Sequence, residues 1–387
     1  MNALLRRWLV VLLMLASSAM MANAQERPRI RDLGLEPGIF EPGPLNAITD
    51  VEGVRVGHRT LVEGEGVRTG VTAILPHGGD LFREKVPAAV YVGNGFGKAA
   101  GFLQVQELGT IETPIVLTNT LSVGTAVEAV VAWTLRRPGN EDVRSVNAVV
   151  GETNDGYLND IRGQHVRPED VWAAIDAATG GPVEEGSVGA GTGTTTLGWK
   201  GGIGTASRVL PEALGGYTLG ALVQTNYGGL LRIDGVPVGE ALGRYSFREV
   251  VEEAASEDAS PESEDEGSCM IVIATDAPLS SRNLERVARR AILGLARTGS
   301  FMSNGTGDFV VAFSTQNRTD GRAVQQVDRL ANDRMSPLFL AAVEAVEEAV
   351  YNALTAATTV RGRDGHVVEA LPLGRVEALL REAGWIE

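Results

Sequence analysis

The sharpest boundary in this 387-residue chain lies where an acidic tract meets an apolar, β-branched run. Residues 249–266 are mainly acids, Ser and Ala, which bury too little apolar surface to offset the entropy of ordering. Residues 269–274 are typical of a buried strand. The pair Gly267-Ser268 joins a tract that is predicted to be mobile to a strand that is predicted to be rigid.

This boundary has two interpretations. The pattern alone favours an acidic surface loop that leads into a core strand. Alternatively, the bond between Gly267 and Ser268 is cleaved, which leaves Ser268 at a new N-terminus with its α-amine beside its hydroxyl. Such an amine has a reference pKa of about 7.7–8.0, close enough to neutrality for a general base. The nucleophile and its base would then belong to one residue.

The first 24 residues have the features of a secretory signal peptide. Arg6 and Arg7 precede an apolar run, and Ala22-Asn23-Ala24 offers a cleavage site before Gln25. The apolar run is shorter than the roughly 20 residues that span a bilayer. We therefore expect export, to the periplasm, and no membrane association once the leader is removed.

Composition excludes several classes of protein. The net charge of −15 argues against a nucleic-acid partner. The single cysteine, Cys269, excludes an intrachain disulfide framework and a thiolate zinc cluster. The four histidines share no HExxH spacing, and no G-x-S-x-G elbow is present. These patterns predict neither metal nor cofactor and favour a mechanism that needs no histidine.

Strand groups and helix pairs alternate along the chain, which favours a layered α/β domain over a helical bundle. A Pro- and Gly-rich segment, residues 27–44, suggests an extended arm on the surface or against a neighbouring subunit. Strands are predicted around residues 51–56, 70–75, 88–92, 146–151, 216–222, 269–274, 309–313 and 367–371, and helices over 125–137, 168–178, 281–298, 338–357 and 375–383. Residues 93–98 and 186–204 are interpreted as glycine-rich turns and bulged strands rather than phosphate loops, because neither phosphate fingerprint has their spacing.

Seven blocks make the sequence recognisable, and together they are far more specific than any one of them. On these blocks the chain resembles the L-aminopeptidase/D-esterase family, which includes the β-peptidyl aminopeptidases. The blocks are GPLNAITDVEGVRVGH (43–58), VGNGFGKAAG (92–101), IETPIVLTNTLSVG (111–124), GETNDGYLNDI (151–161), GSVGAGTGTTTLGWKGGIGTASR (186–208), QTNYGG (224–229) and GSCMIVIATDAP (267–278).

The resemblance implies a self-cleaving hydrolase built as an αββα sandwich of the N-terminal-nucleophile-hydrolase type. One domain, residues 25–387, would be cut into an α chain (25–267) and a β chain (268–387) that stay associated. We expect a homo-oligomer of such αβ heterodimers. The expected substrates are short peptides, amino-acid amides or esters, including β- or D-configured ones.

The resemblance also implies roles for individual residues. Ser268 matches the nucleophile and Asn226 the oxyanion-hole asparagine, with the backbone N–H of Cys269 as a second donor. Glu152 matches the acid that holds the substrate's free amino group. Thr306 and Asp308 match a hydroxyl-x-acid pair next to the nucleophile.

Two positions depart from the family pattern. Asn154 stands where a tyrosine is common, and Thr306 stands where serine is common. Both changes bear on substrate preference and leave the nucleophile untouched. Cys269 is a rival nucleophile, since a cut one residue later would place it at the new N-terminus.

Two other functions stay open at the level of sequence. A self-cleaving acyltransferase of the ornithine acetyltransferase type would have a related architecture, although such enzymes usually begin with threonine. A non-catalytic exported binding protein would use the acidic tract only as a linker.

Overall fold

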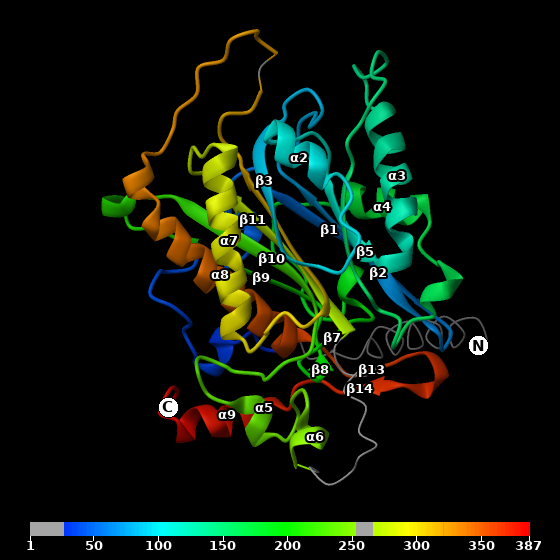
Figure 1. The fold of residues 1–387 in the computed structure, drawn as a ribbon, viewed down its shortest axis with the longest axis vertical. Helices are drawn as coiled ribbons and strands as arrows, with labels where there is room; N and C mark the ends of the chain where they lie inside the picture. Colours follow the sequence, from blue (N-terminus) through cyan, green and yellow to red (C-terminus); the bar gives the residue numbers. More distant parts are fainter. Residues whose placement is uncertain (1–26, 253–265, 320) are drawn as a thin grey trace, which may run out of the picture.

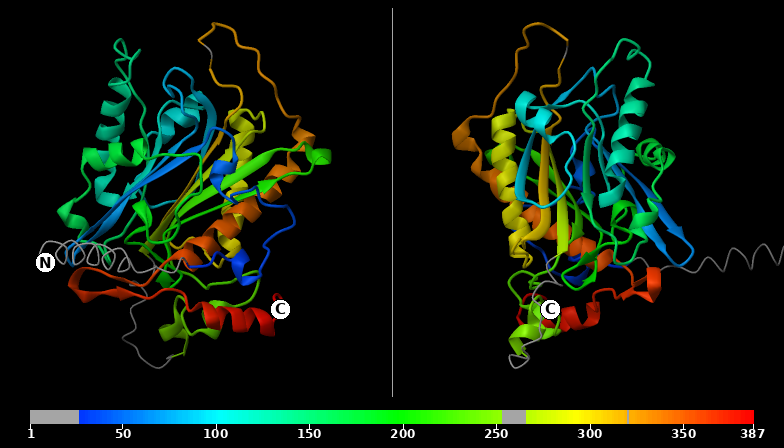
Figure 2. Two further views of the ribbon diagram at one scale, coloured as in Figure 1. Left: turned by 180° about the vertical axis from the view of Figure 1, so that it is seen from behind. Right: turned by 45° about the vertical axis from the view of Figure 1, so that its right-hand side comes forward.

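The computed structural model describes residues 27–252, 266–319 and 321–387. Two β-sheets pack face to face, and helices cover both outer faces (Figure 1). Figure 2 shows the same four layers from behind and from an oblique angle. This arrangement confirms the predicted αββα sandwich. The predicted signal peptide and the centre of the acidic tract, residues 253–265, lie outside the described residues.

The larger sheet contains the strand that follows the Gly267-Ser268 pair. Its order is β4-β3-β12-β11-β10-β9, with β11 parallel to β12 and antiparallel to β10. β11 is therefore central, as its unbroken apolar run predicts. The strands are β3 (Val86–Gly95), β4 (Thr110–Ile111), β9 (Ile203–Val209), β10 (Thr218–Asn226), β11 (Glu266–Thr275) and β12 (Gly305–Ser314).

The smaller sheet has the order β1-β2-β5-β6, and β5 and β6 are parallel. Two short hairpins, β7 with β8 and β13 with β14, lie outside both sheets. The strands are β1 (Arg55–Glu63), β2 (Val67–Leu75), β5 (Ile115–Asn119), β6 (Val149–Thr153), β7 (Thr195–Thr196), β8 (Trp199–Lys200), β13 (Val360–Arg361) and β14 (Val367–Val368).

Helices α7 and α8 cover the larger sheet, and α3 and α4 cover the smaller one (Figure 1). α7, predicted as a helix over 281–298, packs through a stripe of Leu284, Val287, Ala291 and Leu295, all fully buried. The helices are α2 (Phe102–Leu108), α3 (Val123–Leu135), α4 (Pro168–Asp176), α5 (Val238–Ala241), α6 (Arg248–Glu252), α7 (Ser281–Arg297), α8 (Ser336–Ala356) and α9 (Leu373–Glu382). No helix among the described residues has the length and apolar character to cross a membrane.

Side chains from alternate positions of each strand divide between two cores. In β11, Met270, Val272 and Ala274 pack between the sheets, while Cys269 and Ile271 pack under α7 and α8. This alternation follows from the two-residue period of a strand. It decides on which face of the sheet each site residue lies.

The N-terminal arm packs on its own chain. Ile30 and Leu35 are buried in the core beneath α8. Glu344 of α8 accepts hydrogen bonds from the backbone of Ile39 and Phe40 at 3.0 and 3.2 Å. Buried Arg208 of β9 pairs with the same Glu344 at 3.1 Å. The arm thus adds hydrogen bonds to a buried ion pair that links α8 to β9.

Several predicted strands were too short, and the residues by which they extend include members of the candidate site. Glu152 ends a strand rather than opening a turn, because β6 continues to Thr153. The strand predicted to end at Leu222 continues to Asn226, and the strand predicted from Phe309 begins at Gly305. In each case a neighbouring strand supplies hydrogen-bond partners that extend the ladder beyond the apolar run.

Two further boundaries differ from the prediction. Residues 249–252, the start of the predicted mobile tract, belong to helix α6. The N-cap of α8 is Met335 rather than Ser336.

Candidate active site

Ser268 and Asn226 lie directly opposite each other on neighbouring strands. The antiparallel register of β10 and β11 pairs these two residues at the strand ends. Side chains opposite each other in such a pair project from the same face of the sheet. Ser268 is 3% exposed and Asn226 is 9% exposed, and the Ser268 Oγ has no hydrogen-bond partner among the described residues. A buried, unpartnered hydroxyl is thus held beside an amide side chain.

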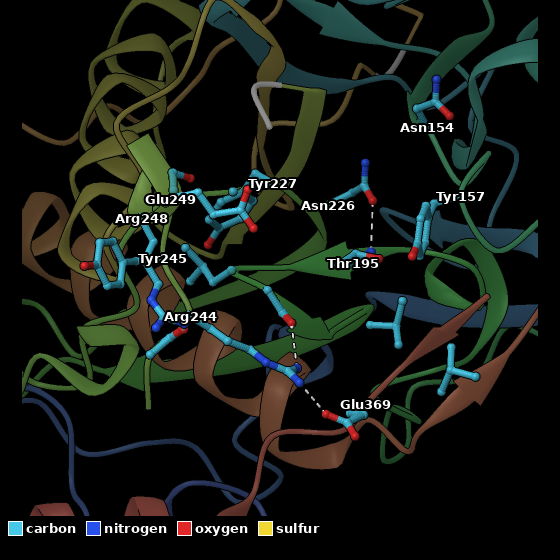
Figure 3. A pocket seen from close by; sticks show the side chains of 18 residues that line it. Asn154, Tyr157, Thr195, Asn226, Tyr227, Arg244, Tyr245, Arg248, Glu249 and Glu369 are labelled. Atoms are coloured by element: carbon cyan, nitrogen blue, oxygen red, sulfur yellow. Dashed lines mark hydrogen bonds and ion pairs between the residues drawn. The ribbon is translucent and has the colours of Figure 1, made fainter. Parts of the chain in front are cut away.

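The Asn226 amide has a defined orientation. Its Oδ1 accepts a hydrogen bond from the backbone N–H of Thr195 at 3.0 Å. The amide nitrogen consequently points away from Thr195 (Figure 3). Asn226 therefore presents a donor on the face of the sheet from which Ser268 projects, which is the arrangement that stabilises an oxyanion.

Cys269 lies on the opposite face from Ser268. Its side chain is fully buried in the core under α7 and α8, beside Tyr227. Burial raises the pKa of the Cys269 thiol well above its ordinary value, and the negative charge of Asp308 acts in the same direction. Because the thiolate is the nucleophilic form, this environment suits a small core residue rather than a nucleophile.

Thr306 and Asp308 lie on β12, beside the start of β11. The parallel register pairs Thr306 with Gly267 and Asp308 with Cys269, so both side chains project from the face opposite to Ser268. The Thr306 hydroxyl donates to Asp308 Oδ2 at 2.5 Å, while Asp308 Oδ1 has no partner in the part of the chain that the structure describes. Burial raises the pKa of Asp308 to about 6, against the opposing effect of the Thr306 hydrogen bond.

Asn94 of β3 holds this pair in place. Its amide nitrogen donates to the backbone oxygens of Thr306 at 2.7 Å and of Ser303 at 2.8 Å. No sequence pattern marks this residue, which lies in the block interpreted as a glycine-rich turn. Only the pairing of Asn94 with Asp308 across β3 and β12 brings it to the site.

Glu152 is buried at the end of β6, with 3% of its surface exposed. Its Oε1 accepts a hydrogen bond from the backbone N–H of Lys98 at 3.0 Å, and its Oε2 accepts one from the Thr120 hydroxyl. These donors fix the carboxylate without neutralising it. The acid can therefore bind a cationic group that enters the site.

Two glycines connect Glu152 to the nucleophile strand. Gly307 is paired with Ser268, and a Cβ on Gly307 would lie 3.2 Å from the Cα of Gly97. A Cβ on Gly97 would in turn lie 3.2 Å from Glu152 Oε1. A side chain at either position would also collide with the Phe309 ring, to which the two Cβ atoms would come within 2.9 and 2.7 Å. The two glycines therefore allow the chain at Gly97 to pack closely between β12 and the Glu152 carboxylate.

An open cavity of about 780 Å³ adjoins Asn226. Asn154 and Tyr157 form one wall of the cavity. Arg244 also lines the cavity and forms an ion pair with Glu369 (Figure 3). The Asn154 Oδ1 accepts the backbone N–H of Gly156 at 2.9 Å. Glu152 does not line this cavity. The buried carboxylate is therefore not part of the wall of this cavity.

Two buried ionisable groups, Lys200 of β8 and Asp155, lie close enough to interact electrostatically. Lys200 donates from Nζ to the backbone oxygens of Gly191 at 2.8 Å and Gly201 at 2.6 Å. Burial lowers the pKa of Lys200 to about 7, while Asp155 raises it by a smaller amount. Burial also raises the pKa of Asp155 to about 7, although its Oδ1 accepts a hydrogen bond from Asn159 at 2.9 Å.

Replacing Asp155 with Asn is expected to stabilise the protein above pH 7. The pKa of Asp155 is raised on folding, so its favourable contribution is complete below pH 4 and is lost as pH rises to about 7. The neutral amide does not undergo this loss. The variant should gain on the order of 2 kcal/mol at pH 8.5 and little at pH 4.5, as measured by urea unfolding.

The control for this prediction is Asp160→Asn, because Asp160 belongs to the same loop but its side chain is 48% exposed. Its unfolding free energy should follow that of the wild type. Equal gains for Asp155→Asn at both pH values would show that charge burial is not the cause.

The fold and the site together define an enzyme of the N-terminal-nucleophile-hydrolase class. The model of "Peptidase family S58" matches residues 46–368. The chain is 43% identical over 377 residues to the β-peptidyl aminopeptidase BapA of Sphingosinicella microcystinivorans, covering 93% of this chain and 94% of that one. The chain belongs to peptidase family S58, and it is an aminopeptidase of that family.

Two solved structures have the same fold. One is a β-aminopeptidase from a Burkholderia species, at a TM-score of 0.82 and 46% identity, covering 92% of this chain and 99% of that one. The other is the L-aminopeptidase D-Ala-esterase/amidase of Ochrobactrum anthropi, described as a new variant of the Ntn hydrolase fold. It matches at a TM-score of 0.83 and 40% identity, covering 93% of this chain and 100% of that one. These likenesses confirm the family resemblance inferred from the sequence blocks.

Proposed function

We propose that this protein is an exported, self-processing serine aminopeptidase that releases the N-terminal residue of short peptides, amino-acid amides or esters, β-configured residues included. One observation carries the proposal: the unpartnered hydroxyl of Ser268 lies opposite Asn226, just past a glycine at the start of a central strand. The leader-like residues 1–24 support export, and the names of the relatives support β-configured substrates. The active form would be an oligomer of αβ heterodimers in the periplasm.

In self-processing, the Ser268 Oγ attacks the carbonyl carbon of Gly267 and displaces its own nitrogen. This forms an ester between the two residues, and water hydrolyses the ester. The products are a carboxylate on Gly267 and a free amine on Ser268. That amine lies on β11 next to β12, where Asp308 Oδ1 still lacks a partner. We infer that Asp308 and Thr306 hold the amine on one face of the strand while the hydroxyl faces the substrate on the other.

In turnover, the free amine takes the proton of the Ser268 hydroxyl as its oxygen attacks the substrate carbonyl. The Asn226 amide and the backbone N–H of Cys269 stabilise the resulting oxyanion. The proton then passes to the departing amine, and water hydrolyses the acyl-enzyme. Glu152 pairs with the ammonium group at the substrate's N-terminus. This ion pair limits the reaction to chain ends.

Intact mass and N-terminal sequencing of the purified protein test self-processing directly. We expect two fragments that co-purify, the smaller beginning at Ser268 and containing residues 268–387. The larger fragment should begin at Gln25 if the leader is removed on export. A single uncleaved chain with full peptidase activity would contradict the proposal. A single uncleaved chain with no activity would favour the binding-protein alternative.

The acyltransferase alternative is tested with acetyl-ornithine and glutamate. An enzyme of the ornithine acetyltransferase type would transfer the acetyl group between them. We expect the processed protein to produce no acetyl-glutamate while it hydrolyses an amino-acid amide.

Replacing Glu152 with Gln is expected to lower kcat/KM for a free dipeptide by about 10- to 100-fold. The variant keeps the shape of the side chain but loses the charge-assisted contact, which contributes roughly 1.5–3 kcal/mol. Self-processing should be much less affected, because the Gly267-Ser268 bond presents no free amine. N-acetylated dipeptides should be poor substrates of the wild type. Equal hydrolysis of free and acetylated peptides by the wild type would refute the role of Glu152.

A further inference from the structure

Tyr157 is an exposed aromatic residue with a fixed orientation. Its side chain is 55% exposed, and it lines the open cavity beside Asn226. One face of its ring stacks on His366, with ring centroids 4.4 Å apart and an interplanar angle of 13°. The His366 Nδ1 also lies 2.8 Å from the backbone oxygen of Tyr157, so that nitrogen carries the proton and donates it.

The backbone around Tyr157 is also anchored. The oxygen of the next residue, Leu158, accepts a hydrogen bond from the backbone N–H of Arg363 at 2.8 Å. Leu158 itself is fully buried. The hairpin of β13 and β14 therefore anchors the loop that carries Tyr157. An aromatic side chain whose orientation is already fixed loses little conformational entropy when it binds a ligand.

The position of Tyr157 relative to the catalytic groups indicates which part of a substrate it contacts. Glu152, which would bind the substrate's amine, is buried behind Gly97 and does not line the cavity. Asn226 lines the cavity, and its amide would bind the oxygen of the scissile carbonyl. Tyr157 and Thr195 line the same cavity (Figure 3). A peptide with its amine at Glu152 and its carbonyl at Asn226 continues into the cavity with its second residue.

We propose that Tyr157, backed by His366, is a platform for the side chain of the substrate's second residue and gives the enzyme a preference for aromatic leaving groups. This inference rests on the proposed function, and it names the substrate class of that site. Val367 of the same hairpin is 40% exposed and also lines the cavity, so it extends the apolar surface beside the ring. Aromatic rings stack favourably on such a surface.

The test compares three substrates that share an N-terminal β-alanine. They are β-alanyl-phenylalanine, β-alanyl-alanine and β-alaninamide, which has no side chain beyond the scissile bond. For the wild type we expect kcat/KM about 10-fold higher for the phenylalanine peptide than for the alanine peptide. Tyr157→Ala should reduce this ratio to about 1, mainly through a higher KM for the phenylalanine peptide. Tyr157→Phe should keep it, because the ring is retained.

Two more variants separate the platform from a general surface effect. His366→Ala should lower the ratio partway, because the tyrosine ring loses the support of one face. Trp385→Ala is the matched control, since Trp385 is 52% exposed and lies outside the cavity. It should keep the full ratio.

Each remaining outcome overturns the inference. A wild-type ratio near 1, a ratio that survives Tyr157→Ala, or an equal fall in Trp385→Ala would remove the platform. A change in preference for the first residue, measured with L-alanyl in place of β-alanyl substrates, would place Tyr157 on the wrong side of the scissile bond. If the processed wild type hydrolyses β-alaninamide and cleaves the two dipeptides equally well, the platform is refuted but the proposed function stands. If it hydrolyses none of the three, the proposed function fails as well.

Discussion

Replacing Ser268 with Ala is expected to give an uncleaved chain with no measurable turnover. The substitution removes the only nucleophile in the proposed scheme and also prevents release of the α-amine that would act as its base. Nucleophile and base are therefore lost together, and the loss should exceed about 10⁴-fold in kcat. Intact mass and hydrolysis of β-alaninamide measure the two effects.

Cys269→Ala is the matched control for this prediction. The thiol lies in the core on the opposite face of β11, so its removal should loosen packing but leave processing and turnover intact. An active Ser268→Ala together with an inactive, normally processed Cys269→Ala would show that Cys269, and not Ser268, is the nucleophile.

Replacing Asn226 with Ala is expected to lower kcat by about 10²- to 10³-fold, because removal of one oxyanion donor typically has this effect. KM should change little, since the donor acts mainly on the charge that develops in the transition state. Self-processing should also slow, because the same amide lies beside the Gly267-Ser268 bond. Steady-state kinetics on the processed variant and the time course of cleavage after synthesis measure these effects.

Thr195→Ala is the control for Asn226. The backbone N–H of Thr195 orients the Asn226 amide, whereas no described residue forms a hydrogen bond with the Thr195 hydroxyl. The alanine variant keeps that N–H, so kcat should stay within about 3-fold of the wild type. A large loss in Thr195→Ala with a small loss in Asn226→Ala would show that the oxyanion is stabilised elsewhere.

The sequence by itself determined the layered α/β fold and most of its elements, and it supplied Ser268 as the candidate nucleophile. The apolar run after Ser268 predicted a central strand, and the spacing of Leu284, Val287, Ala291 and Leu295 predicted the buried face of α7. Such features depend on local chemistry: on β-branched residues, on helical periodicity and on the change in composition at Gly267. The family blocks added Asn226, Glu152, Thr306 and Asp308, and strand pairing places three of these, Asn226, Thr306 and Asp308, beside the start of β11.

Only the tertiary structure decided how these residues face one another. Strand pairing places Ser268 opposite Asn226 and puts Thr306 and Asp308 on the other face of the same sheet. It also brings Asn94 to Asp308 and Thr195 to Asn226, although neither contact has a sequence signal of its own. The stacking of His366 on Tyr157 joins segments about 200 residues apart. The physical reason is that a single-residue change of register moves every side chain of a strand to the opposite face, so long-range pairing determines the site.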